Sequence, residues 1–224
     1  RGLQRTTRAL YLESPVIETG RLMDLRPPRA LSQELGIALI VDATAASPVN
    51  FTPLAHGADV VLHDATHFLE PHVEEVRLKM ETWGAVPHPL LRMQLERGLA
   101  TLEVRVQRQN ATAQAVAEWA LKHREIRAVE WVGLSTHPDH ALANEWFTGP
   151  GSLVHLQLDE AHDAERVAAR TTVLLTDSYG GRNVVTRVTA SEPGWVRMQI
   201  GLESPDTIIA ALISALTTTS LTAS

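Results

Sequence analysis

The stretch "IALIVD", residues 37–42, is a continuous apolar run of strand length that ends on a carboxylate. Such a run suits a strand of a parallel sheet that is buried on both faces. The flanking sequence repeats the pattern in "RALYLE" (8–13) and "GADVVLH" (57–63). Paired prolines open a helix through "RALSQELG" (29–36), and Gly36 ends it. Strands that alternate with helices in this way predict an α/β fold.

Beyond residue 90 the apolar spacing changes from that of strands to that of helices. The residues that recur at helical spacing are Leu91, Leu95, Leu99, Leu102 and Val106. Gly98 and Asn110 interrupt the pattern with residues of low helix propensity, so it predicts either one long helix or two in series. We place the boundary between two lobes near residues 105–115, which gives domains 1–110 and 111–224.

The rest of the sequence returns to an alternation of strands and helices. The predicted elements are strand "AVEWVGL" (128–134), a His/Pro-rich turn, strand "GSLVHLQL" (151–158), helix "AHDAERVAAR" (161–170), strand "TTVLL" (171–175), loop "TDSYGGRN" (176–183), strand "GWVRMQIGLE" (194–203) and a helix from Asp206 to about Leu216. The large side chains of Met93, Trp119, Trp131 and Trp146 lie on these patterns and are expected in the core.

Composition limits the classes of function. The chain has 224 residues, of which 44% are hydrophobic, with a net charge of -6 and no cysteine. The acidic balance argues against a nucleic-acid partner, and the missing cysteine excludes disulfides, thiolate catalysis and cysteine-bearing zinc sites. No apolar stretch approaches the roughly 20 residues that span a bilayer, and no signal peptide is visible, so we expect a cytoplasmic location without a membrane partner. The start at Arg1, close to a strand, indicates a beginning within a longer protein.

Several stretches, taken in order along the chain, carry a resemblance to a known family. They are "YLESP" (11–15), "IALIVDAT" (37–44), "SPVNFTPLAHGADVVLHDATHFL" (47–69), "LERGLATLEVRVQRQNATAQAVAEWA" (95–120), "GLSTHPDHALA" (133–143), "SYGG" (178–181) and "WVRMQIGLES" (195–204). Together they resemble the Cys/Met-metabolism pyridoxal-phosphate (PLP) enzymes, which include cystathionine synthases and lyases. The resemblance implies the aspartate-aminotransferase-like fold, called fold type I, with the second half of the large domain followed by the C-terminal small α/β domain.

The resemblance also implies a set of site residues. Asp42 matches the aspartate that pairs with the protonated pyridine nitrogen of PLP and keeps the ring an electron sink. Thr44 and Thr66 fall at cofactor-binding positions, and Thr66 matches a hydroxyl that contacts the phosphate. Ser178 and Arg197 match residues around the substrate carboxylate, which the planar guanidinium of arginine binds through two hydrogen bonds.

Simpler interpretations stay open for two of these residues. Asp42 could do no more than cap the turn after its strand. Arg197 could form an ion pair with Glu192 or Glu203 instead of lining a pocket.

The histidines raise the question of a metal site. His63, His67 and His72 crowd one turn, but their spacing fits no closed zinc pattern, and a strand running into a turn would not bring them to one face. We therefore expect no metal site. His137 and His140, in "THPDH", match a turn of the family and are expected to hold that turn.

Four departures from the family pattern lie in or beside the cofactor site. His67 replaces the lysine that forms the Schiff base with PLP, and imidazole has no primary amine for that step, although it could act as a base. Asp64 replaces a serine that would bind the phosphate, and two unit charges about 4 Å apart repel by roughly 4 kcal/mol at an effective dielectric constant near 20. Ile17 replaces an asparagine bonded to the ring oxygen, and Glu70 and Pro71 replace a Gly-Gly pair.

Three functions are consistent with this pattern. We favour a non-catalytic homologue that binds PLP weakly or not at all and serves an active paralogue as scaffold or regulator. The alternatives are a working PLP-dependent lyase or γ-synthase whose missing half comes from another chain, and a different enzyme that uses His67 as a base. We also expect a homo-oligomer or hetero-oligomer, because half of a parallel sheet would leave strand edges and apolar faces around residues 37–72 bare.

Overall fold

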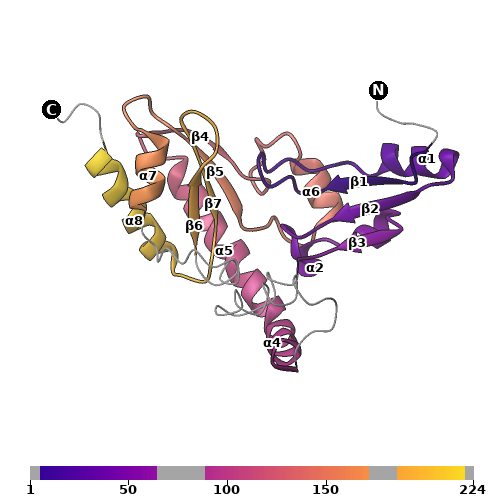
Figure 1. Ribbon diagram of the computed structural model, residues 1–224. Helices are drawn as coiled ribbons and strands as arrows, with labels where there is room; N and C mark the ends of the chain where they lie inside the picture. Colours follow the sequence, from indigo (N-terminus) through magenta and orange to yellow (C-terminus); the bar gives the residue numbers. More distant parts are fainter. Residues whose placement is uncertain (1–5, 65–88, 172–185, 220–224) are drawn as a thin grey trace.

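The computed structural model describes residues 6–64, 89–171 and 186–219. It contains two β-sheets that are joined by a pair of consecutive helices (Figure 1). No helix in the described ranges is long and apolar enough to cross a membrane. The expectations for Thr66, His67 and Ser178, and most of the strand and loop expected over residues 171–183, lie outside the described residues.

The first sheet is parallel. Its strands follow the order β1 (Ala9–Glu13), β2 (Ala38–Asp42) and β3 (Val60–Leu62). As predicted, α1 (Arg26–Leu35) connects β1 to β2 and ends at Gly36, whose φ of 62° suits a glycine. Leu39 and Val41 are fully buried, whereas Ile40 is only half-buried. The expectation that both faces of this strand are fully buried is therefore wrong, because one face packs on the core and the other remains partly open.

Two consecutive helices lead from the first sheet to the second. A short helix, α2 (Ser47–Asn50), and a 3₁₀ turn, η1 (Pro53–His56), precede β3. Of the two alternatives, two helices in series is correct: α4 (Pro89–Ala100) and α5 (Leu102–Ala120) are separated at Thr101. Figure 1 shows α5 running from beside α2 to the second sheet. The predicted domain boundary at residue 110 falls inside α5 and stays a prediction.

The second sheet is antiparallel, and helices cover one of its faces. Its strands follow the order β4 (Ile126–Glu130), β5 (Leu153–Leu158), β7 (Trp195–Gln199) and β6 (Arg187–Ala190). The helices packed with them are α5, α7 (Ala164–Arg170) and α8 (Pro205–Thr219) (Figure 1). Val154, Leu156, Val196 and Met198 alternate along β5 and β7 and face the core that these helices complete. His155 and Arg197 therefore lie on the opposite face.

Some predicted elements differ from the observed ones. β4 ends at Glu130 instead of continuing to residue 134, because Trp131 turns inward and its Nε1 donates a hydrogen bond to the carbonyl of Gly151 at 3.0 Å. Neither β6 nor α6 (His140–Trp146) was predicted. Trp131 and Trp146 are buried as expected, but Met93 is 48% exposed, so its assignment to the core is wrong.

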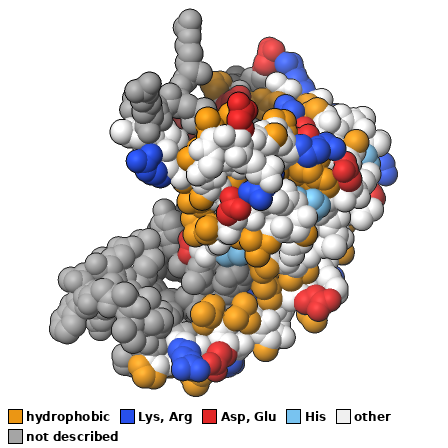
Figure 2. Space-filling model, turned by 90° about the vertical axis from the view of Figure 1, so that its right-hand side faces the viewer, with side chains coloured by type: hydrophobic (Ala, Val, Ile, Leu, Met, Phe, Trp, Pro, Cys, Tyr) orange, Lys and Arg blue, Asp and Glu red, His pale blue; other side chains and the backbone are white. Residues whose placement is uncertain are grey.

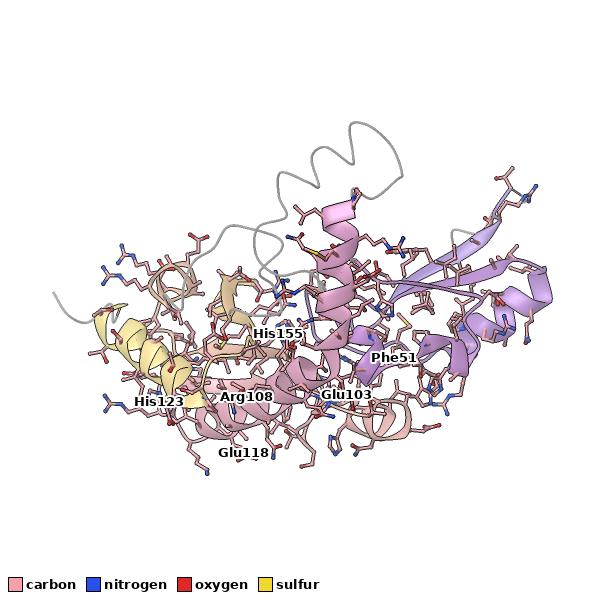
Figure 3. All side chains as sticks on the ribbon, turned by 90° about the horizontal axis from the view of Figure 1, so that it is seen from below. Phe51, Glu103, Arg108, Glu118, His123 and His155 are labelled. Atoms are coloured by element: carbon pink, nitrogen blue, oxygen red, sulfur yellow. The ribbon has the colours of Figure 1, made fainter. Side chains whose placement is uncertain are left out.

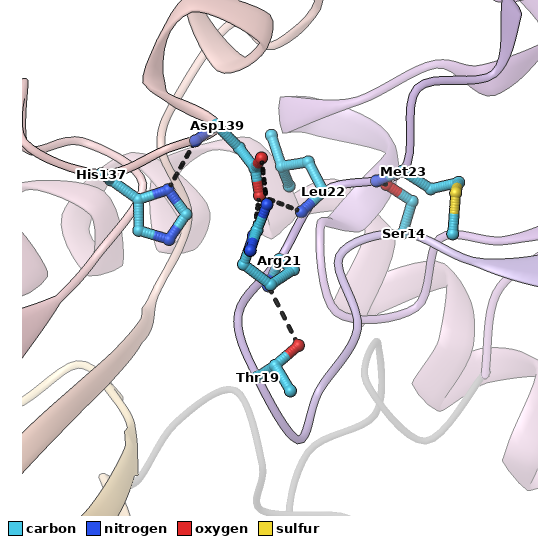
Figure 4. A network of polar contacts seen from close by, with 7 residues as sticks. All are labelled: Ser14, Thr19, Arg21, Leu22, Met23, His137 and Asp139. Carbon is cyan, nitrogen blue, oxygen red and sulfur yellow. Dashed lines mark hydrogen bonds and ion pairs between the residues drawn. The ribbon is translucent and has the colours of Figure 1, made fainter.

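The two halves of the chain are tied together around Asp139. Its carboxylate accepts hydrogen bonds from Nε and Nη2 of Arg21, at 2.6 and 3.0 Å, and from the backbone N–H of Leu22 at 2.9 Å (Figure 4). Nδ1 of His137 accepts a hydrogen bond from the backbone N–H of Asp139, and Nδ1 of His140 bonds the carbonyl of Val132. These two histidines hold the turn, in agreement with their expected structural role.

Candidate functional site

Asp42 lies at the carboxyl end of β2, where parallel α/β sheets commonly bind ligands. Its Oδ2 accepts a hydrogen bond from the Tyr11 hydroxyl at 2.8 Å, and its Oδ1 accepts one from the backbone N–H of Thr44 at 3.0 Å. Burial disfavours the charged carboxylate, but the hydrogen bonds from Thr44 and Tyr11 outweigh it and hold the pKa of Asp42 below its usual value. Asp42 is thus ionised at neutral pH. It caps its turn, and its position still allows contact with a ligand.

Thr44 and Asp64 lie next to Asp42 at the same edge of the sheet. Oγ1 of Thr44 accepts a hydrogen bond from the backbone N–H of Asp64 at 2.9 Å, which connects the segment after β2 to the segment after β3. The Asp64 residue is exposed. The structure therefore brings Asp42, Thr44 and Asp64 together, while Thr66 and His67 lie outside the described residues.

Glu13 is a member of the site that the sequence interpretation missed. It ends β1 and is the register partner of Asp42. Burial and the nearby Glu18 raise the pKa of Glu13, whereas the Arg197 guanidinium acts in the opposite direction. Glu13 is therefore close enough to feel both Asp42 and Arg197, which belong to different sheets. The available signal was its place at the end of a strand parallel to "IALIVD".

Arg197 reaches from the second sheet toward the first. Its Nη1 donates a hydrogen bond to the carbonyl of Ile17 at 3.4 Å, a long contact across 180 residues of sequence. Glu203 instead accepts hydrogen bonds from the backbone N–H and the hydroxyl of Thr186, both at 2.8 Å. Within the described ranges Arg197 forms an ion pair with neither Glu192 nor Glu203, so that alternative has no support there, and a pocket role for Arg197 stays a prediction. Ser178, its expected neighbour, lies outside those ranges.

His155 is the second residue that the sequence interpretation missed. It is the register partner of Arg197, so both side chains extend from the same face of the second sheet (His155 is labelled in Figure 3). Burial, the Arg197 guanidinium and His137 lower the pKa of His155 to about 4. Its Nε2 is buried without a hydrogen-bond partner in the described structure. The sequence signal that could have identified His155 is the alternation of residues along its strand, which places it on the same face as Arg197.

The arrangement fits part of what PLP and an amino-acid substrate require. An ionised Asp42 suits a protonated pyridine nitrogen, and Arg197 suits a carboxylate. PLP chemistry also requires a primary amine, and the sequence has two lysines that could provide one, Lys79 and Lys122. Lys79 lies outside the described residues. Lys122 lies beyond Ala120, the last residue of α5.

No metal centre is present in the described part of the chain, where no three His, Asp or Glu side chains are arranged to hold an ion. Of the histidines weighed as ligands, His63 lies beside Asp42, and burial lowers the pKa of its imidazole. His67 and His72 lie outside the description.

Comparisons with known proteins agree on one family. Residues 1–217 match the family described as "Cys/Met metabolism PLP-dependent enzyme". The chain is 31% identical over 245 residues to a chloroplastic cystathionine gamma-synthase from Nicotiana tabacum, covering 95% of this chain and 45% of the relative. It is 34% identical over 192 residues to a cystathionine gamma-synthase from Mycobacterium leprae, covering 78% and 50% of the two chains. A crystal structure of a methionine gamma lyase from Micromonospora echinospora superposes with a TM-score of 0.82 at 29% identity, over 96% of this chain and 64% of the solved one. The chain thus spans about half the length of these curated relatives and has their α/β fold over that part.

Proposed function

The chain belongs to the Cys/Met metabolism PLP-dependent enzyme family, and from that premise we propose that it is a non-catalytic member, which serves an active homologous chain as scaffold or regulator. One observation carries the proposal. Asp42 is the register partner of Glu13, and Arg197 is near enough to lower the pKa of Glu13, whereas Lys122, the lysine within the described residues, lies beyond the end of α5. We infer that residues suited to the cofactor and the substrate carboxylate have been kept, while His67 stands at the position of the family's lysine.

The chemistry explains why this loss is decisive. When bound, PLP supplies an electron sink for a carbanion at the α-carbon of an amino acid. In this chain Asp42 would hold the ring nitrogen, and Arg197 would hold the amino-acid carboxylate. His67 stands in sequence where the family has its lysine, and an imidazole can move a proton but cannot condense with an aldehyde. The exposed carboxylate of Asp64, next to Thr44, would repel a phosphate.

Exposed apolar side chains support the assembly part of the proposal. Val60 and Leu62 of β3 are each 43% exposed, and Leu54 and Tyr11 are more exposed still. Figure 2 shows hydrophobic side chains gathered on the face of the molecule that includes the first sheet. Covering such a face by another chain would remove apolar surface from water. We propose a homologous chain as the partner and the cytoplasm as the setting.

A working PLP-dependent lyase or γ-synthase is the second candidate. The ionised state of Asp42 and the absence of an ion pair at Arg197 within the described residues favour it, because both groups remain ready for cofactor and substrate. In that case another chain would provide the rest of the cofactor site. The third candidate, a reaction that uses His67 as a base, depends on a residue outside the described ranges.

Titration of PLP into the purified chain, alone and with an active homologous chain, separates these candidates. We expect no visible aldimine band from this chain and a mixed oligomer by light scattering. A strong band that borohydride bleaches would contradict the proposal, and Lys79→Arg and Lys122→Arg would then identify the lysine. The double variant His67→Lys with Asp64→Ser is the matched control, since it restores the amine and removes the added charge. A monomer at micromolar concentration in the mixture would argue against assembly.

A further inference from the structure

We propose that His155 is a second ligand-binding donor beside Arg197, and that the two side chains together hold the carboxylate of an α-amino acid. This inference deepens the proposed function, since it rests on the proposed role of Arg197 in holding an amino-acid carboxylate. The residues that it adds are His155, on β5, and Glu13, on β1.

The positions of the two donors follow from the strand register. His155 of β5 pairs directly with Arg197 of β7, so the side chains are neighbours on the face of the sheet opposite to the one on which α5, α7 and α8 pack. A planar carboxylate has two oxygens, and one can accept from the guanidinium while the other accepts from the imidazole.

The His155 ring is placed for such a contact but has no partner for it. The residue is 3% exposed, and its buried Nε2 lacks a hydrogen bond within the described structure. Buried polar atoms are rarely left unpaired, and each exception calls for an explanation. The ring edge faces Gly20, where an added Cβ would lie 3.5 Å from Nε2. An adjacent cavity of about 20 Å³, lined by Gly20 and His137, has room for about one water.

The segment around Ile17 occupies the place that a ligand would take. The carbonyl of Ile17 accepts a hydrogen bond from Nη1 of Arg197 at 3.4 Å. That distance lies beyond the usual range for an N–H···O bond, so a carboxylate would replace a weak neutral contact by a charge-assisted one. Binding would then shift Ile17 and Gly20 away from the sheet.

The charged groups around His155 favour an amino acid over a simple anion. Arg197 and His137 face the imidazole, and Glu130 of β4 is its register partner on the other side. Glu13, which feels the charge of Arg197, could receive the ammonium group of the ligand. A carboxylate held between His155 and Arg197 would favour the charged imidazole and raise the pKa of His155 above its value of about 4 in the free chain.

Binding of L-methionine to the purified chain, without PLP, tests the inference, with methioninol as the matched ligand that lacks a carboxylate. We expect His155→Leu to weaken L-methionine binding roughly tenfold or more, and His155→Gln, which keeps an N–H donor, to restore most of the affinity. His162→Leu is the control. His162 is also buried and has an Nδ1 without a hydrogen bond in the described structure, but it lies just before α7 and is not a register partner of Arg197. That variant should bind as the unaltered chain does.

A second measurement needs no variant that might fail to fold. In the unaltered chain, the pKa of His155 followed by NMR should rise when L-methionine is added and should not move with methioninol. A purely structural histidine, satisfied by one water, would show neither effect and would overturn the inference. So would equal binding by His155→Leu, or no binding of L-methionine at millimolar concentration. An aldimine band in the PLP titration would contradict the proposed function and leave these results unchanged.

Discussion

Asn50, at the end of α2, and Asn110, in the middle of α5, exchange side-chain hydrogen bonds in both directions, at 3.1 and 2.9 Å. The two amides lie 60 residues apart in sequence and satisfy each other at the point where the first half of the chain meets α5. Each amide is a donor and an acceptor at once, so a carboxylate, which can only accept, could not take the place of either without losing a bond.

Removing one member of this pair should destabilise the fold. Asn50 is 4% exposed, so Asn110→Ala leaves a buried amide unpaired and should lower the free energy of unfolding by about 1–3 kcal/mol. The double variant Asn50→Ala with Asn110→Ala should lose less free energy of unfolding than the two single variants lose in total, because it leaves no unpaired amide. Urea denaturation measures both. Asn144→Ala, which removes an exposed amide bonded to His140 on α6, is the control and should change little.

Gly149 packs against the same two amides. A Cβ at this position would overlap the side chains of Asn110 and Asn50, so we expect Gly149→Ala to cost about 1–3 kcal/mol of stability. Asn110→Ala in the same chain should relieve part of that cost. Gly151→Ala is the comparison for backbone strain without overlap. Nothing lies within 4 Å of its Cβ position, so any cost of that variant comes from its φ of +82°. If Gly149→Ala with Asn110→Ala were no more stable than expected from the two single variants, overlap with Asn110 would not be the cause of the lost stability.

Asp139 should contribute to stability in a defined pH range. Burial disfavours its charge, yet the hydrogen bonds from Arg21 and Leu22 hold the pKa of Asp139 below its usual value. A carboxyl whose pKa is lower in the folded state stabilises the fold above its unfolded pKa of about 4, and that stabilisation is lost as the pH falls through the folded pKa. Asp139→Asn should cost about 1–3 kcal/mol at pH 7 and little at low pH. Asp24→Asn, at an exposed ion pair with Arg26, should cost far less. Thermal unfolding at several pH values would detect the difference.

His155 should produce a pH dependence of the same sign as that of Asp139, but in a higher pH range, because its folded-state pKa is also lowered. Its pKa is about 4 in the folded chain and about 6.5 when unfolded. Between these values the unfolded state takes up the proton first, so stability falls as the pH decreases, by on the order of 3 kcal/mol in total. His155→Leu should remove this slope between pH 6.5 and pH 4. An unchanged slope in the variant would assign the effect to other groups.

Tyr11 should control the protonation of Asp42 without supporting the fold. The hydroxyl of Tyr11 donates to Asp42, and this bond raises the pKa of Tyr11 while lowering that of Asp42. Because Tyr11 is 58% exposed, Tyr11→Phe should raise the pKa of Asp42 and leave the free energy of unfolding nearly unchanged. NMR titration of the carboxyl carbon measures the shift. A large loss of stability in Tyr11→Phe would mean that the hydroxyl also supports the fold, and would contradict the prediction.

The elements that the sequence predicted well are those with long and regular patterns. "IALIVD" and the helix that ends at Gly36 are specified by local residues, so β2 and α1 appear where they were expected. By contrast, α6 has seven residues and β6 has four, and neither is long enough to show a clear period. The end of β4 depends on the bond between Trp131 and Gly151, a contact between distant residues that no local pattern contains.

The site shows the same division. Asp42, Thr44 and Arg197 were found because their motifs match a family. Glu13 and His155 were missed because their importance depends on strand pairing, which joins Glu13 to Asp42 and His155 to Arg197. A histidine in an apolar strand gives no sign of its neighbour until the register is known.

The position of α6 has a consequence for the order in which the chain can fold as it is synthesised. Trp146 and Phe147, at the end of α6, pack with Phe51 in the core of the first sheet, with the rings of Phe51 and Phe147 stacked 4.3 Å apart. A nascent chain that has reached only the end of α5 already contains the three described strands of that sheet, but its aromatic core is still incomplete. The first half therefore has to wait on the ribosome with Phe51 unpacked until residue 147 has emerged, and this interval is when a chaperone would be most needed.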